Sequence, residues 1–120
     1  MKKIIVTGGY GFIGRNLINY LIRKKFYVIN VDKLTYSSSR YNSKSFDKKN
    51  YNFFRLDIND RLKFSKILKK YKPVAIYNIA AETHVDRSID DPKNFISSNI
   101  LGVFNLLESV RGYIKKTKKK

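Results

Sequence analysis

Residues 4–14 read Ile-Ile-Val-Thr-Gly-Gly-Tyr-Gly-Phe-Ile-Gly, an apolar run that breaks into spaced glycines just before an amphipathic stretch. This order predicts a buried strand, a tight turn and a helix. Gly8 permits the turn off the strand, Gly11 lets a ligand approach the backbone, and Gly14 lets the helix lie close to the sheet. The free N–H groups of a helix start attract an anion. The stretch therefore predicts the phosphate-binding turn of a dinucleotide-binding fold; the alternative is a glycine turn without a ligand.

Apolar periodicity predicts alternating strands and helices along the rest of the chain. We expect strands at 3–7, 27–31, 51–56 and 74–79, helices at 12–24, 61–70 and 92–113, and a long loop at 33–50. Strands that alternate with helices form parallel sheets through right-handed crossovers. The pattern thus predicts an α/β fold, an incomplete Rossmann-type doubly wound sheet of about four strands in the order 3-2-1-4. The fourth strand reads as covered on both faces, but its outer edge would be unpaired or only partly covered.

Each predicted helix has an apolar face at helical spacing, and Asn59 or Asp60 can cap the second helix. The residues expected to face inward are Ile13, Leu17, Ile18, Leu21 and Ile22 on the first helix, Phe64, Ile67, Leu68 and Tyr71 on the second, and Phe95, Ile96, Ile100, Val103, Leu107 and Val110 on the third.

The composition limits the function classes. The chain of 120 residues has no cysteine and one histidine, which argues against thiolate or His-rich metal sites. No apolar run approaches the roughly 20 residues of a membrane span, so we expect a soluble, cytoplasmic protein without a membrane partner. The net charge of +17 raises nucleic acid as a partner, but most lysines are scattered over predicted helix faces and only 115–120 forms a cluster. We therefore do not expect nucleic-acid binding.

Two carboxylates follow predicted strands at the same edge of the sheet. Asp32 lies 21 positions after Gly11, where a carboxylate can accept both ribose hydroxyls of an adenosine and would repel a 2′-phosphate. This position predicts NAD in preference to NADP, although Lys33 beside it could soften that preference. Asp57 closes the third strand, at a position suited to an adenine amino group. The alternatives are an aspartate that merely ends a strand, for Asp32, and a turn aspartate that leads into a helix, for Asp57.

Residues 79–83 follow the fourth strand, beside the switch point where open α/β sheets bind ligands. Small side chains at 80 and 81 would let a flat cofactor lie against the backbone. His84 and Arg87 come next and are candidate substrate-binding groups. A structural histidine, and an ion pair of Arg87 with a neighbouring aspartate, are the alternatives.

Several segments together resemble the dTDP-glucose 4,6-dehydratases, which belong to the extended short-chain dehydrogenase/reductases. They are residues 7–14 (TGGYGFIG), 31–36 (VDKLTY), 57–58 (DI), 80–89 (AAETHVDRSI) and 99–108 (NILGVFNLLE). The resemblance implies that NAD contacts Gly8, Gly11, Phe12, Ile13 and Gly14 with its pyrophosphate, Asp32, Lys33, Leu34 and Thr35 with its ribose, Asp57 and Ile58 with its adenine, and Ile79, Ala80, Ala81, Glu82, Thr83 and Ser98 on the nicotinamide side. It places Thr83 near the sugar as well, beside the candidate substrate-binding groups His84 and Arg87.

In that family, NAD removes a hydride from C4 of the glucose ring, water leaves from C5 and C6, and the hydride returns to C6. The resemblance also implies a homodimer and a dTDP-glucose substrate. The family's catalytic Thr-Asp-Glu segment and Tyr-x-x-x-Lys pair have no counterpart here, since Tyr20 and Lys24 share that spacing by coincidence on the first helix. Residues 37–40 read Ser-Ser-Ser-Arg where the family has Ala-Gly-Asn, which leaves the loop beside the adenosine open.

The sequence therefore predicts that residues 1–120 are the amino-terminal part of an NAD-binding Rossmann domain, without a substrate domain, without catalytic residues and inactive alone. Two alternatives stay open at this point. One is a non-catalytic nucleotide-binding module whose basic surface contacts an acidic partner. The other is a related UDP-sugar dehydratase or epimerase.

Overall fold

The computed structural model describes residues 1–9, 11–33, 49–79 and 100–117. The described chain forms two compact units. The first comprises Met1–Leu56 and Pro73–Ala80, and the second comprises Asp57–Lys72 and Ala81–Lys120. Most of the predicted long loop and the segment from 80 to 99 lie outside the described residues.

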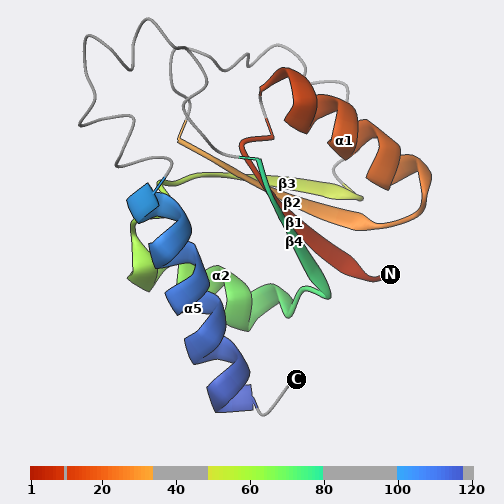
Figure 1. The fold of residues 1–120 in the computed structure, drawn as a ribbon. Coiled ribbons are helices and arrows are strands. Elements are labelled where there is room, and N and C mark those ends of the chain that lie inside the picture. The colour runs from red at the N-terminus through yellow and green to blue at the C-terminus, as the bar shows by residue number, and fades with distance from the viewer. Residues whose placement is uncertain (10, 34–48, 80–99, 118–120) are drawn as a thin grey trace, which may run out of the picture. The chain divides into compact units, whose positions relative to one another are not determined.

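The first unit is built on a four-stranded parallel sheet in the order β3-β2-β1-β4 (Figure 1). Its strands are β1 (Lys3–Thr7), β2 (Tyr27–Asp32), β3 (Tyr51–Arg55) and β4 (Ala75–Asn78). In the register, Ile5 of β1 lies between Ile29 of β2 and Ile76 of β4. The predicted α/β class and strand order are confirmed.

Helix α1 (Phe12–Arg23) packs on one face of this sheet. Its Ile18 and Leu21 are buried in a cluster with Ile4, Val6 and Val28 of the central strands, and Tyr51 of β3 closes the cluster. The same strands also bury the side chains that alternate with these. A parallel sheet with central strands buried on both faces is typical of α/β proteins.

The predicted inward face of α1 is wrong at one position. Ile13 is 65% exposed, whereas Gly14, Ile18 and Leu21 form the buried stripe. Successive residues of a helix are about 100° apart, so a stripe that begins at Gly14 turns Ile13 away from the sheet. Ile13 therefore lies beside the open end of the helix and outside the core.

Strand β4 is shorter and less buried than predicted. It covers four residues, and none of them is fully buried, because it lies at the edge of the described sheet and pairs with β1. Val74 and Tyr77 are exposed. The apolar run alone indicated a strand covered on both faces, whereas the predicted edge position is confirmed.

The second unit contains α2 (Arg61–Tyr71) and α5 (Gly102–Thr117), which pack side by side. Helix α2 begins after Asp60, whose side chain accepts a hydrogen bond from the Lys63 N–H at 3.2 Å. It buries Phe64, Ile67, Leu68 and Tyr71, as predicted. None of the helices in the described part of the chain has the length and apolar character that crossing a membrane requires.

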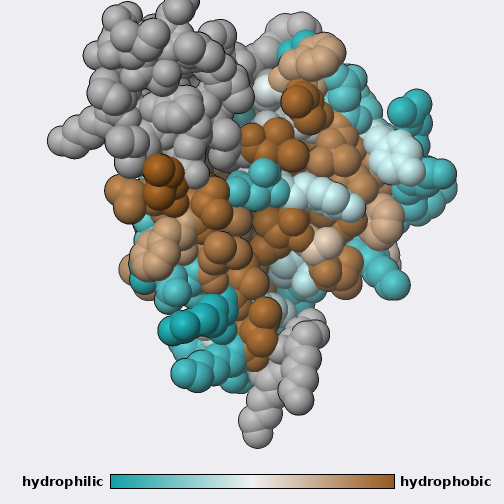
Figure 2. Space-filling view, viewed as in Figure 1, coloured by the Kyte–Doolittle hydropathy of each residue, from teal (hydrophilic) through white to brown (hydrophobic). Residues whose placement is uncertain are grey.

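The inward face predicted for the third helix is wrong in part. Helix α5 buries Leu106, Ser109 and Tyr113, whereas Leu107 is 59% exposed and Ile100, just before the helix, is 61% exposed. The predicted Val103 and Val110 are half-buried, and Phe95 and Ile96 lie outside the described residues. Figure 2 shows apolar surface over the beginning of this helix. The helix has apolar residues on opposite sides, so periodicity alone selects no single inward face. It also extends beyond the predicted end, to Thr117.

Two of the isoleucines of α1, Ile18 and Ile13, provide a matched test of this packing. We expect Ile18→Ala to lower the free energy of unfolding by about 2–5 kcal/mol, because Ile18 is 0% exposed and its loss leaves a cavity. Ile13→Ala, the same change on the same helix, should alter it by less than about 0.5 kcal/mol. Urea unfolding followed by circular dichroism measures both. Equal losses for the two variants would contradict the observed face of α1.

Candidate functional site

The glycine turn joins β1 to α1 with a left-handed residue at its start. Gly8 has φ of 74°, a conformation that side chains rarely adopt. Its N–H donates to the Val31 carbonyl of β2 at 2.8 Å, and its own carbonyl accepts from the Gly11 N–H at 3.2 Å. The turn is thus tied to the central strands at one end and closed on itself at the other, which supports the role predicted for Gly8.

Gly14 lies too close to the turn for any side chain. A Cβ at Gly14 would lie 2.2 Å from the Gly8 carbonyl oxygen and 2.7 Å from the Cα of Gly9. Both neighbours are backbone atoms, which cannot move aside as a flexible side chain can. This close approach of helix to turn is the one predicted for Gly14.

Gly11 differs from its neighbours because no contact inside the described chain requires it. A Cβ there would meet only the Gly8 oxygen, at an ordinary 3.5 Å, and its φ of −72° and ψ of 171° suit any residue. Gly11 is the residue immediately before α1. The close approach of a ligand to the backbone at Gly11 stays a prediction, and the described contacts offer no internal reason for a glycine there.

The start of α1 presents N–H groups that the helix itself does not use. The first bond of the helix runs from Arg15 N–H to the Gly11 carbonyl at 3.0 Å, which leaves the N–H groups of Phe12, Ile13 and Gly14 ahead of it. Gly11 makes no side-chain cap, and the first turn contains no acidic residue. The Arg15 guanidinium lies 5.4 Å from the centre of the Phe12 ring and adds positive charge. These features suit an anion.

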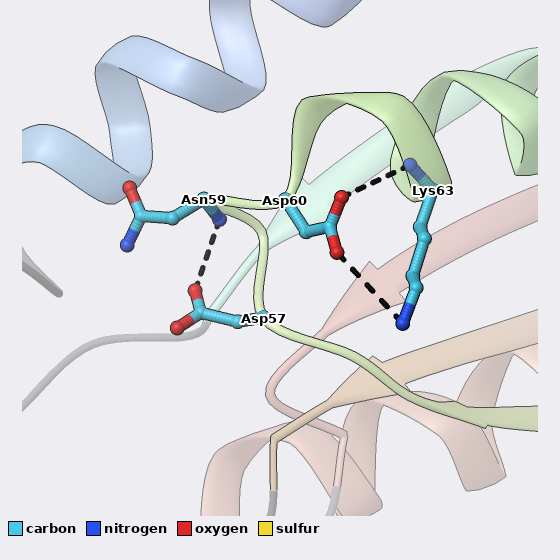
Figure 3. Close-up of polar contacts among 4 residues, drawn as sticks. All are labelled: Asp57, Asn59, Asp60 and Lys63. Carbon is cyan, nitrogen blue, oxygen red and sulfur yellow. Dashed lines mark hydrogen bonds and ion pairs between the residues drawn. The ribbon is translucent and has the colours of Figure 1, made fainter.

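The start of α2 shows the opposite arrangement (Figure 3). Here Asp60 accepts from the backbone of Lys63, and its carboxylate also pairs with the Lys63 ammonium at 3.9 Å. A helix start that holds its own carboxylate offers little to another anion. Between the starts of α1 and α2, that of α1 is therefore the one suited to bind a phosphate.

Asp32 is the last residue of β2 and is buried. Side chains alternate along a strand, so Asp32 lies on the same face as Val28, which packs against α1. Its carbonyl accepts from the Leu56 N–H at 3.1 Å, which ties the ends of β2 and β3 together. Lys33 follows and is half-buried. The structure thus places the predicted ribose carboxylate at the carboxyl edge of the sheet, on the face of the glycine turn.

Asp57 belongs to the turn that leads into α2. Its Oδ1 accepts from the Asn59 N–H at 2.9 Å, and Ile58 between them is buried (Figure 3). An aspartate that bonds to the backbone two residues later forms a common turn. This is the alternative that the sequence left open, and the adenine contact of Asp57 and Ile58 stays a prediction.

Part of the predicted site lies outside the described residues. Ile79 is described, and its N–H donates to the Thr7 carbonyl at 3.0 Å. Nine other predicted positions lie outside the described residues, in the segments 34–48 and 80–99: Leu34, Thr35, Ala80, Ala81, Glu82, Thr83, His84, Arg87 and Ser98. The described ranges contain no cluster of three or more side chains able to hold a metal ion.

Sequence reasoning missed two residues, Gly9 and Asn30. The Oδ1 of Asn30 accepts from the Gly9 N–H at 2.9 Å, although 21 residues separate them. Gly9, Gly11 and Gly14 also fit the G-x-G-x-x-G spacing, which would have identified Gly9. An asparagine inside the apolar strand 27–31 was the available signal for Asn30, since a buried amide needs partners.

Comparison with known proteins now identifies the family. A family model described as GDP-mannose 4,6 dehydratase matches residues 5–120. The chain belongs to this family. Among curated proteins, the dTDP-glucose 4,6-dehydratase of Neisseria meningitidis serogroup B is 45% identical over 115 residues, which cover 94% of this chain and 32% of the relative. The resemblance to dTDP-glucose 4,6-dehydratases predicted from sequence is thus confirmed.

Solved structures of the same fold include complexes with NAD. The dTDP-glucose 4,6-dehydratase of Bacillus anthracis in complex with NAD matches with a TM-score of 0.81 and 36% identity, over 94% of this chain and 34% of that one. The UDP-glucose 4-epimerase of Thermus thermophilus in complex with NAD matches with a TM-score of 0.81 and 32% identity, over 92% and 34%. The chain spans about a third of the length of the curated relatives it matches.

The contrast between Gly14 and Gly11 can be tested by stability alone. We expect Gly14→Ala to lower the free energy of unfolding by about 2 kcal/mol or more, because the new methyl group overlaps the Gly8 backbone. Gly11→Ala should change it by less than about 1 kcal/mol, because that methyl group has room and the backbone is unstrained. Thermal and urea unfolding of both variants measure the difference. A Gly11→Ala variant as unstable as Gly14→Ala would show that the chain itself requires this glycine.

Proposed function

We propose that the glycine turn and Asp32 form the NAD-binding site of a nucleotide-sugar 4,6-dehydratase. The observation that carries the proposal is the start of α1. N–H groups precede the first hydrogen bond of the helix there, and position 11 is glycine although the chain itself has room for a side chain. Membership of the 4,6-dehydratase family and the NAD complexes of related structures support it.

The residues fit the cofactor in chemistry and in placement. The N–H groups of Phe12, Ile13 and Gly14 would hold the pyrophosphate, because they are donors at the positive end of a helix. The carboxylate of Asp32 would accept the hydroxyls of the adenosine ribose, which favours NAD over NADP. Both groups belong to one compact unit and lie at the edge where β1 and β2 end.

The described residues would bind and orient NAD, and NAD would supply the chemistry of hydride transfer. When bound, NAD would accept a hydride from the sugar and return it within one reaction cycle. The turn would fix the pyrophosphate, and Asp32 would fix the adenosine, so that the cofactor extends toward the carboxyl ends of β1 and β4, where ligands bind in open α/β sheets. Ile79 and the positions predicted after it would then lie on the nicotinamide side.

We propose dTDP-glucose as the substrate of the complete enzyme, on the strength of the relatives that bear that name. The loss of water from C5 and C6, the homodimer and the cytoplasmic location belong to the same proposal, as does the absence of activity in this chain alone. A UDP-sugar is the second candidate, supported by the similarity to UDP-glucose 4-epimerase. The described residues include no predicted sugar contact that would separate the two.

The net charge of +17 supports the remaining alternative, a non-catalytic module that binds an acidic partner. Such binding is driven by many exposed cations and weakens steeply with salt. Binding of NAD through a buried carboxylate and backbone donors depends far less on salt, because few exposed charges take part. Salt dependence therefore separates the two proposals.

The test is a calorimetric titration with NAD. We expect Asp32→Ala to weaken NAD binding about 10- to 100-fold, since it removes hydrogen bonds to a charged group. Asp60→Asn is the control, because it removes a carboxylate from the cap of α2 while asparagine still caps a helix start. That control should bind NAD as the original chain does. Equal binding by Asp32→Ala and Asp60→Asn would contradict the role of Asp32.

The same titration at about 50 and 200 mM salt tests the alternative. We expect the dissociation constant for NAD to change little, and to be unaffected by removal of residues 115–120. A steep loss of affinity with salt, together with loss on removal of these residues, would instead support the basic module.

A further inference from the structure

Asn30 is a polar side chain in the interior of the first unit. It lies in β2 between Ile29 and Val31 and is 0% exposed. A buried amide destabilises the fold unless its groups are hydrogen-bonded. The partners of Asn30 therefore indicate why the strand contains it.

Two hydrogen bonds fix the Asn30 amide. Its Oδ1 accepts from the Gly9 N–H at 2.9 Å, and its Nδ2 donates to the Tyr51 hydroxyl at 3.0 Å. A backbone N–H can only donate, so the oxygen of the amide must face Gly9 and the nitrogen must face Tyr51. The side chain thus bridges the glycine turn and the first residue of β3.

At Gly9, the turn lies so close to Asn30 that only glycine leaves room for its side chain. A Cβ at Gly9 would lie 2.1 Å from the Asn30 Oδ1 and 2.5 Å from the Ile18 Cδ1. Gly14, at the start of α1, packs against the same turn. A Cβ at Gly14 would lie 2.7 Å from the Gly9 Cα. The turn is therefore held from the helix by a steric contact and from β2 by a hydrogen bond.

Asn30 and Asp32 occupy the same face of one strand, two residues apart. At about 3.3 Å per residue, their Cα atoms are separated by about 7 Å along β2. The residue that holds the turn and the carboxylate expected to hold the ribose are thus parts of one rigid element. Their spacing sets where the phosphate-binding N–H groups lie relative to the ribose site.

We propose that Asn30 is a positioning residue for the phosphate-binding turn, with Tyr51 orienting its amide. The proposal rests on the proposed NAD site and adds a buried residue that touches no part of the cofactor. The hydrogen bond to Gly9 orders the turn when the chain folds, so that the cofactor does not have to order it on binding. Loss of Asn30 should weaken ligands that contact the turn and spare ligands that contact only the ribose site.

Three ligands separate these contributions: NAD, ADP and adenosine, which lacks phosphate. Asn30→Leu keeps roughly the shape of the side chain and removes its hydrogen bonds. We expect it to weaken binding of NAD and ADP about tenfold, the effect of one hydrogen bond, and to leave adenosine binding within about twofold. Calorimetry, or NMR titration for the weak ligand, measures all three.

Asn105→Leu is the matched control. Asn105 also joins two partners through its amide, since its Nδ2 donates to Asn59 Oδ1 and its Oδ1 accepts from Arg61 Nε, but it belongs to the second unit. It should bind all three ligands as the original chain does. A similar loss of ADP binding in this control would mean that any lost asparagine bridge weakens the site, and would overturn the proposal.

Tyr51→Phe keeps the proposal testable if Asn30→Leu fails to fold. It removes only the hydroxyl that orients the amide, and we expect about a threefold loss of ADP affinity, with faster hydrogen exchange at the Gly9 N–H. Unchanged ADP binding and unchanged Gly9 exchange in this variant would overturn the proposal, as would an equal loss of adenosine binding. If the original chain bound none of the three ligands, the proposed NAD site itself would be wrong.

Discussion

The contact between Gly14 and the backbone of Gly8 and Gly9 determines where the rest of the site lies. Because a side chain at Gly14 would overlap the Gly8 carbonyl, α1 can approach the end of β1 only with glycine there. That approach sets the unused N–H groups of α1 beside the strand ends. On the other side of this contact, the turn is shaped by the left-handed Gly8 and held by the hydrogen bond that the Gly9 N–H donates to the Asn30 Oδ1. Away from this contact, ordinary apolar packing of Ile18 and Leu21 in the buried cluster holds α1 against the sheet.

The starts of α1 and α2 differ in whether a carboxylate of this chain, which has 26 basic and 9 acidic residues, lies at the positive end of the helix. At α2, Asp60 satisfies the backbone and pairs with Lys63, so the positive end of the helix is neutralised within the chain. At α1 no acidic residue occupies the first turn, and Arg15 adds to the positive potential. An anion that binds there gains from the helix dipole without competing with a carboxylate of the protein. The high net charge strengthens this attraction for any phosphate, so the charge alone does not select one phosphate ligand over another.

The sequence predicted those bounds and buried faces that follow from one local pattern. It did not predict features that depend on how distant elements pack. The bounds of β1 and the buried face of α2 follow from an apolar run with a turn or cap at its end. The face of α5 does not, because apolar residues line both sides and only packing against α2 selects one. The apolar run at 74–79 indicates burial on both faces, although the predicted strand order already places this strand at the edge, where β4 is only partly buried. Asn30 was missed since no local pattern links it to Gly9, 21 residues away.

The crowding at Gly9 has a consequence for how this sequence can diverge. Its missing Cβ occupies space already filled by the Asn30 amide and the end of the Ile18 side chain. A larger residue at position 9 would therefore need the side chains at positions 18 and 30 to shift or to be smaller, because its Cβ would meet both of them. Positions 9, 18 and 30 should accordingly vary as a group among relatives, although they lie on a turn, a helix and a strand.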